Sequence, residues 1–153
     1  MPKIDIDKIP VRATSNYPQE FLQVIAGREK RALGNAAGLT QFGVNLTTLK
    51  PGAASSLRHW HVQEDEIVYI LDGEVTLVEE GSETMLKAGD AAGFKANVAN
   101  GHQLVNKSSR DVIYLEMGTR SKNEIAHYPD VDLALNYGAD GKPRYTHKSG
   151  ESY

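Results

Sequence analysis

The sequence contains no cysteine, which excludes a disulfide framework, a thiolate metal site and a cysteine nucleophile. It also lacks an apolar run long enough to cross a bilayer, and residues 1–10 alternate charged with apolar residues instead of forming the apolar stretch of a secretory signal. An excess of positive charge is missing as well, because the formal net charge is -3 at pH 7. We therefore expect a cytoplasmic protein that binds neither membranes nor nucleic acid.

One short segment, residues 28–31 (REKR), is strongly cationic but includes Glu29. Mixed charge runs usually face water, so we expect a solvated surface here and not a binding patch.

The chain of 153 residues is long enough for a single domain with its own core. Residues 39–119 consist of short apolar runs separated by turn signals, which is typical of an antiparallel β-sandwich or barrel. Residues 1–38 form an irregular N-terminal extension in which QEFLQVI is either a short helix or an edge strand. Residues 120–153 predict a loop-rich tail along the barrel, docked in part by its tyrosines.

The segment SLRHWHVQEDEIVYILDGE carries the first candidate site. On a strand, His59 and His61 would leave the backbone on the same face, because alternate residues share a face. The run that begins at Glu66 and ends at the turn pair Asp72-Gly73 is apolar at both alternating sets of positions, so we expect it to be buried on both faces. A carboxylate that opens a buried strand needs a compensating charge, and a cation shared with two histidines supplies it.

A further candidate ligand, His102, opens the short alternating segment HQLVN after a Gly- and Asn-rich approach. Three histidines and one glutamate suit borderline divalent metals such as iron, manganese, nickel, copper or zinc, and leave coordination positions open for a ligand. The alternative is that these are ordinary polar residues of half-buried strands.

These residues resemble the two conserved motifs of the cupin superfamily. Gly52, His59-x-His61, Glu66 and Gly73 follow the spacing of the first motif with one additional residue after the first glycine. His102 and Asn106 match the end of the second motif, whereas its front half differs by what looks like a two-residue insertion before His102.

The resemblance implies an all-β antiparallel double-stranded β-helix, or jelly-roll barrel, of the small single-domain type. The domain would span residues 1–153 with a core barrel at about 39–119. It also implies a divalent metal ion, Fe, Mn, Ni or Zn, held by His59, His61, Glu66 and His102. The remaining histidines, His127 and His147, lie in the predicted tail, where we expect them to be surface residues.

The resemblance leaves the function open, since cupins include isomerases, dioxygenases, lyases, decarboxylases and binding proteins. We expect a metalloenzyme that acts on a small polar substrate, sugar-like or carrying a carboxylate or carbonyl group, bound at open metal positions. The alternative is a metal-dependent binding or structural cupin without turnover. No catalytic residue is assigned, because Glu116 and Tyr114 share a face that is either the barrel interior or its outside. Small cupins usually pair, so we expect a homodimer.

Overall fold

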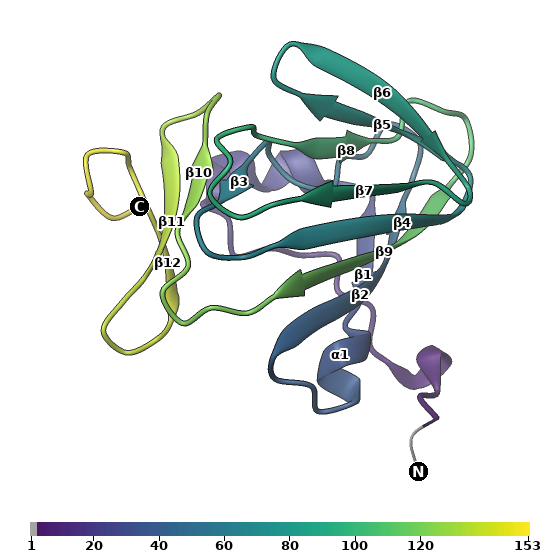
Figure 1. The fold of residues 1–153 in the computed structure, drawn as a ribbon, viewed down its shortest axis with the longest axis horizontal. Helices are drawn as coiled ribbons and strands as arrows, with labels where there is room; N and C mark the ends of the chain where they lie inside the picture. Colours follow the sequence, from purple (N-terminus) through teal and green to yellow (C-terminus); the bar gives the residue numbers. More distant parts are fainter. Residues whose placement is uncertain (1–2) are drawn as a thin grey trace.

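The computed structural model describes residues 3–153 as an antiparallel β-structure with two short segments of 3₁₀-helix and one α-helical turn (Figure 1). In chain order the elements are η1 (Ile6–Lys8), η2 (Gln19–Ile25), β1 (Arg28–Arg31), α1 (Leu33–Ala36), β2 (Phe42–Leu49), β3 (Trp60–His61), β4 (Glu66–Asp72), β5 (Glu74–Glu79), β6 (Ser82–Lys87), β7 (Ala91–Phe94), β8 (Gln103–Val105), β9 (Val112–Thr119), β10 (Ala126–Tyr128), β11 (Leu133–Tyr137) and β12 (Pro143–Thr146). The QEFLQVI segment is η2, so the helical alternative is the correct one.

Two of the three sheets form the barrel. A five-stranded sheet has the order β1-β2-β9-β4-β7, and a three-stranded sheet has the order β6-β5-β8. The main core lies on their inner faces and consists of Leu49, Ala53, Val68, Ile70, Val75, Leu77, Leu86, Leu104, Val112 and Tyr114. This confirms the predicted antiparallel double-stranded β-helix.

The corner between β4 and β5 needs a glycine. Gly73 has φ +81°, and a Cβ atom there would lie 2.7 Å from the carbonyl oxygen of Asp111. Only glycine meets both requirements without strain, so the predicted turn after Asp72 is confirmed.

Strand β4 is buried on one face only. Val68 and Ile70 are 2% and 0% exposed, whereas Ile67, Tyr69 and Leu71 are 45%, 41% and 45% exposed. The prediction that this strand is buried on both faces is therefore wrong, because an antiparallel sheet needs to be covered on one side only.

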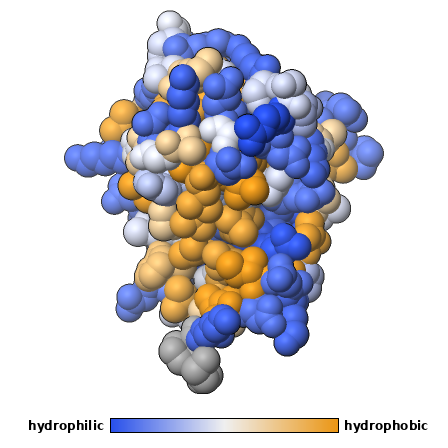
Figure 2. All heavy atoms as spheres, turned by 90° about the vertical axis from the view of Figure 1, so that its right-hand side faces the viewer, coloured by the Kyte–Doolittle hydropathy of each residue, from blue (hydrophilic) through white to orange (hydrophobic). Residues whose placement is uncertain are grey.

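An apolar band is visible on the outside of the molecule (Figure 2). The described residues contain no helix long and apolar enough to cross a membrane.

The cationic segment REKR is strand β1, at the edge of the five-stranded sheet beside β2 (Figure 1). Arg28 is only 6% exposed, and the Lys30 ammonium lies 2.7 Å from a Glu116 carboxylate oxygen. The expectation of a solvated surface is therefore wrong. Strand alternation turns Arg28 and Lys30 to the same face, and the pairing with β2 makes that face the barrel interior.

The C-terminal segment is more regular than predicted. Strands β10, β11 and β12 form a four-stranded sheet with β3, at the side of the barrel (Figure 1). A second apolar cluster joins this sheet to the N-terminal segment and consists of Tyr17, Ile25, Ala126, Tyr128 and Leu133. The predicted loop-rich tail is thus wrong in its local structure, because pairing with β3 supplies the hydrogen bonds that the sequence pattern did not indicate.

Candidate metal centre

The first two candidate ligands lie where the chain crosses from one sheet to the next. His61 belongs to β3, and His59 forms an isolated bridge with His102, with backbone N–O distances of 3.1 and 2.9 Å. Trp60 points to the other side and stacks on His127, with ring centroids 4.5 Å apart. The predicted alternation is confirmed.

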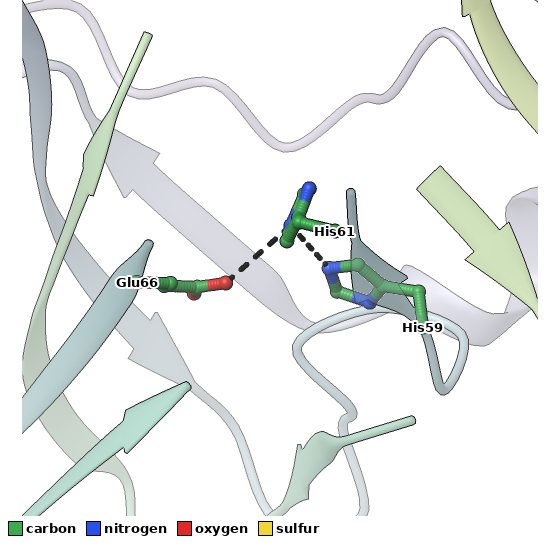
Figure 3. A group of neighbouring side chains, drawn as sticks. All are labelled: His59, His61 and Glu66. Atoms are coloured by element: carbon green, nitrogen blue, oxygen red, sulfur yellow. Dashed lines mark hydrogen bonds and ion pairs between the residues drawn. The ribbon is translucent and has the colours of Figure 1, made fainter. Parts of the chain in front are cut away.

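Glu66, at the start of β4, faces the same interior as Val68. Figure 3 shows its carboxylate directed at the rings of His61 and His59. The Nε2 atoms of these two histidines are 3.1 Å apart, and Glu66 Oε2 lies 3.6 Å from His61 Nε2. His102 Nε2 lies 3.3 Å from the same carboxylate oxygen. The structure thus brings ligand atoms of His59, His61 and Glu66 within 4.8 Å of one another, and His102 joins this group through the Glu66 carboxylate.

The separations among His59, His61 and Glu66 fit a metal ion, whereas His102 is near the Glu66 oxygen and lies outside this mutually close group. With metal–nitrogen bonds of about 2.1 Å, neighbouring ligand atoms are about 3.0 Å apart at right angles and about 3.4 Å apart in a tetrahedron. His59 Nδ1 lies 2.9 Å from the Leu57 carbonyl oxygen, so Nδ1 carries the proton and Nε2 keeps its lone pair for a cation. Burial, together with the neighbouring His61 and His102, lowers the pKa of His59 to about 3, which keeps the ring neutral.

The electrostatics of the cluster favour one added positive charge. Burial raises the pKa of Glu66, but hydrogen bonds from His102 and His61 outweigh it and hold the pKa well below its usual range. Burial lowers the pKa of His61, but the carboxylates of Glu66 and Glu124 outweigh it and raise the pKa above its usual value. The ionised Glu66 carboxylate thus lies beside the His61 ring, whose raised pKa shows that it attracts a proton. A metal cation bound at this place would replace that proton.

Sequence reasoning missed Glu124, which is 1% exposed. Its two carboxylate oxygens accept hydrogen bonds from the backbone amides of Val62 and Gln63, at 2.9 and 3.0 Å. Oε1 also lies 3.4 Å from Nδ1 of His61, at ion-pair distance but without a well-aligned hydrogen bond, so its charge faces the ring. No sequence signal indicated this role, because Glu124 lies in the segment predicted as a loop-rich tail.

A second group of metal-ligand types, His61, Glu64 and Glu124, lies nearby. It is a poorer metal site, because both oxygens of Glu124 are engaged by amides and Glu64 Oε1 accepts a hydrogen bond from Ser121 N at 2.6 Å. We therefore interpret Glu124 as a residue that supports His61 and not as a metal ligand.

The irregular segment before His102 does not displace its ring. Asn97, which has φ +60°, donates its backbone amide to the carbonyl of His61 at 2.8 Å. Phe94 stacks on the His102 imidazole with a centroid distance of 3.6 Å and an interplanar angle of 2°. The stacking on Phe94 holds the His102 ring with Nε2 toward Glu66.

A cavity of about 440 Å³ contains this cluster and extends across the inner face of the five-stranded sheet. Tyr114 and Glu116 both line it, so the face that the sequence left undecided is the interior. The carboxylate of Glu116 accepts hydrogen bonds from Lys30 at 2.7 Å and from Asn45 at 3.0 Å. Burial raises the pKa of Glu64, which lines the same cavity.

The other two histidines lie outside the cluster. His127 stacks on Trp60, and His147 Nδ1 lies 2.9 Å from the Asp132 carboxylate. Both residues are partly exposed, in line with the surface positions predicted for them. Arg58, next to His59, points away and pairs with the carboxylates of Glu80 and Asp130.

Comparison with known proteins gives consistent relatives. The family model of the cupin domain matches residues 45–118. A sugar phosphate isomerase from a cupin superfamily of Silicibacter pomeroyi DSS-3 is 42% identical, with 99% of this chain and 96% of that chain covered and a TM-score of 0.94. An Acidithiobacillus ferrooxidans protein, whose name proposes the same activity, is 28% identical over 82% of this chain and 80% of that chain, with a TM-score of 0.74.

A more distant likeness shows the fold alone. The polyketide cyclase RemF of Streptomyces resistomycificus is 16% identical over 78% of this chain and 79% of that chain, with a TM-score of 0.63. A comparison with curated proteins finds no match.

Proposed function

This protein belongs to the cupin superfamily, and we propose that it is a metal-dependent isomerase acting on a small phosphorylated sugar. The observation that carries the proposal is the convergence of four donor side chains in one cavity. Their ligand atoms, on His59, His61, Glu66 and His102, are separated by 3.1 to 3.6 Å along the contacts that join them. The metal is iron, manganese, nickel or zinc, which all accept this set of ligands.

The chemistry of the cavity supports a polyhydroxylated substrate. Lys30, Asn45 and Glu116 form a hydrogen-bonded row on its wall, and such groups suit sugar hydroxyls. The Silicibacter pomeroyi protein, similar over nearly the whole chain, is named a sugar phosphate isomerase. The name and the polar cavity point to the same class of substrate.

Isomerisation needs an acid–base group beside the reacting carbon atoms. Glu64 is suited to this role, because its carboxylate lies within 4.8 Å of a His61 ring nitrogen and lines the cavity. Its pKa is raised by burial, which makes the carboxylate a better proton acceptor.

A bound divalent ion supplies Lewis-acid polarisation of the substrate oxygens. In the proposed reaction Glu64 takes the proton from C2 of an aldose and returns it to C1, while the hydroxyl proton moves from O2 to O1. The product has the same formula as the substrate, so the reaction needs no co-reactant. A dioxygenase reaction, in contrast to this isomerisation, would require O₂ as a second substrate.

The test combines metal analysis with proton exchange. Protein purified without added metal is analysed for bound metal, reconstituted with iron, manganese, nickel or zinc, and incubated with a panel of aldose and ketose phosphates in D₂O. We expect near-stoichiometric metal and deuterium incorporation at C1 or C2, detected by NMR.

The matched variant is Glu64→Gln, which we expect to retain metal while exchange falls at least about a hundredfold. Stoichiometric metal without turnover of any substrate would favour the non-catalytic binding cupin. Absence of metal from the native and all reconstituted forms would refute the metal centre itself.

A further inference from the structure

Arg28 is a buried cation without an anionic partner. Its side chain lines the cavity, yet it donates hydrogen bonds only to two backbone carbonyls, those of Ser55 and Thr14. Its Nε atom is buried without a hydrogen-bond partner, and no carboxylate among residues 3–153 forms an ion pair with it. A guanidinium stays charged at any physiological pH, so this burial leaves a charge uncompensated.

Such a charge is costly, because moving an ion out of water into a protein costs several kcal/mol unless an opposite charge accompanies it. The other cations that line this cavity are better compensated or more open. Lys30 is paired with Glu116, and Arg12 is exposed. Arg120 is exposed and bonds to the Leu39 carbonyl and the Asn35 side chain. Arg28 is thus the buried cation of the wall that forms no ion pair with any residue in the range 3–153.

A second orphaned polar atom lies in the same wall. Tyr114 is fully buried, and its hydroxyl lies beside the Thr47 hydroxyl without a hydrogen bond of normal geometry to any described residue. It lines the cavity together with Arg28. A cation and an unused hydroxyl donor facing one space are the complement of an oxyanion.

We propose that Arg28 anchors an oxyanion of the ligand that binds this cavity, a phosphate or a carboxylate, with Tyr114 as an additional donor. The proposal rests on the proposed function, since it names the group by which the substrate is held. Ser55, whose carbonyl binds Arg28, precedes Ser56, whose hydroxyl lies 3.2 Å from Nδ1 of His59. The anion anchor and the donor cluster are thus linked through two adjacent residues and line the same cavity, which a single ligand would occupy.

The test measures anion binding directly and does not depend on turnover. Inorganic phosphate and acetate are titrated separately into the full-length protein by calorimetry, as purified and after removal of metal with a chelator. We expect saturable binding of one anion that survives chelation, because an anion held only by a metal would be released. A lower Kd for phosphate assigns the site to a phosphorylated ligand, and a lower Kd for acetate assigns it to a carboxylate.

Three variants make the test specific. Arg28→Gln keeps a polar side chain but removes the charge, and Arg28→Lys retains the charge without the planar fork. We expect the Kd to rise at least about tenfold in the first and less in the second. The control is Arg31→Gln on the opposite face of the same strand, where the guanidinium bonds to the Ile9 carbonyl, and its Kd should not change.

Circular dichroism confirms that each variant is folded before titration. The proposal is overturned if neither anion binds after chelation, or if folded Arg28→Gln and Arg28→Lys bind as tightly as the parent. Failure of the isomerase assay alone leaves this result intact, because inorganic phosphate binding requires no reaction.

Discussion

Glu124→Gln is the most informative single substitution, because the residue supports the candidate centre without belonging to its four donors. The Glu124 carboxylate is almost completely buried and accepts hydrogen bonds from two backbone amides, at 2.9 and 3.0 Å. It also lies 3.4 Å from Nδ1 of His61. Glutamine has nearly the same size but offers one acceptor oxygen and an NH₂ group that opposes the second amide. The substitution therefore breaks one contact and removes the charge beside His61.

The expected magnitude follows from these contacts. A hydrogen bond to a charged group contributes about 1.5–3 kcal/mol, so we expect the free energy of unfolding to fall by about 2–3 kcal/mol. In a domain of this size each kcal/mol corresponds to about 2–4 °C, which predicts a decrease in Tm of about 4–12 °C. Loss of a group that orients a ligating histidine typically weakens metal binding about 10- to 100-fold.

The assay is differential scanning calorimetry of the metal-free protein, followed by competitive metal titration against a chelating dye. Glu151→Gln, in the exposed C-terminal segment, is the control and should change neither quantity. An unchanged Tm and an unchanged metal affinity for Glu124→Gln would refute the supporting role assigned to this carboxylate.

Three further predictions concern metal binding, packing and assembly. Alanine at His59, His61 or His102, or glutamine at Glu66, should abolish the metal-dependent rise in Tm. The control variants His127→Ala and His147→Ala should preserve it. The reverse pattern would place the metal site elsewhere. Ile70→Ala should cost about 2–5 kcal/mol in urea unfolding, whereas Leu71→Ala, exposed on the other face of β4, should cost less than about 1 kcal/mol, and equal costs would contradict the one-sided burial. We expect a homodimer by light scattering, and Ile67→Lys on the exposed apolar face of β4 should weaken it; a monomeric parent at working concentration would contradict this.

Local periodicity was sufficient to predict the common face of three candidate ligands. His59 and His61 share a side because alternate residues of extended chain do so, and Glu66 shares the interior with Val68 for the same reason. The turn at Gly73 was likewise readable, since a positive φ strongly favours glycine. That these side chains lie together is observed, and their role as metal ligands stays a prediction.

Long-range pairing was not readable in the same way. The segment REKR has the composition of a solvated surface, but pairing of β1 with β2 turns Arg28 into the barrel. Strand β4 is apolar on both faces, yet only one face is covered. The sequence of the strand could not indicate this, because burial depends on which other elements pack against each face.

Three properties could be predicted from the sequence: which residue types can bind a cation, which of them share a strand face and where the main turns fall. They depend on neighbours a few positions away. The folded chain was needed to show that His102 pairs with His59, that Glu124 faces His61 and that Arg28 lies buried in the cavity wall. Each of these depends on which distant strands pair, and the free energy of that pairing comes from burial and hydrogen bonds summed over the whole barrel.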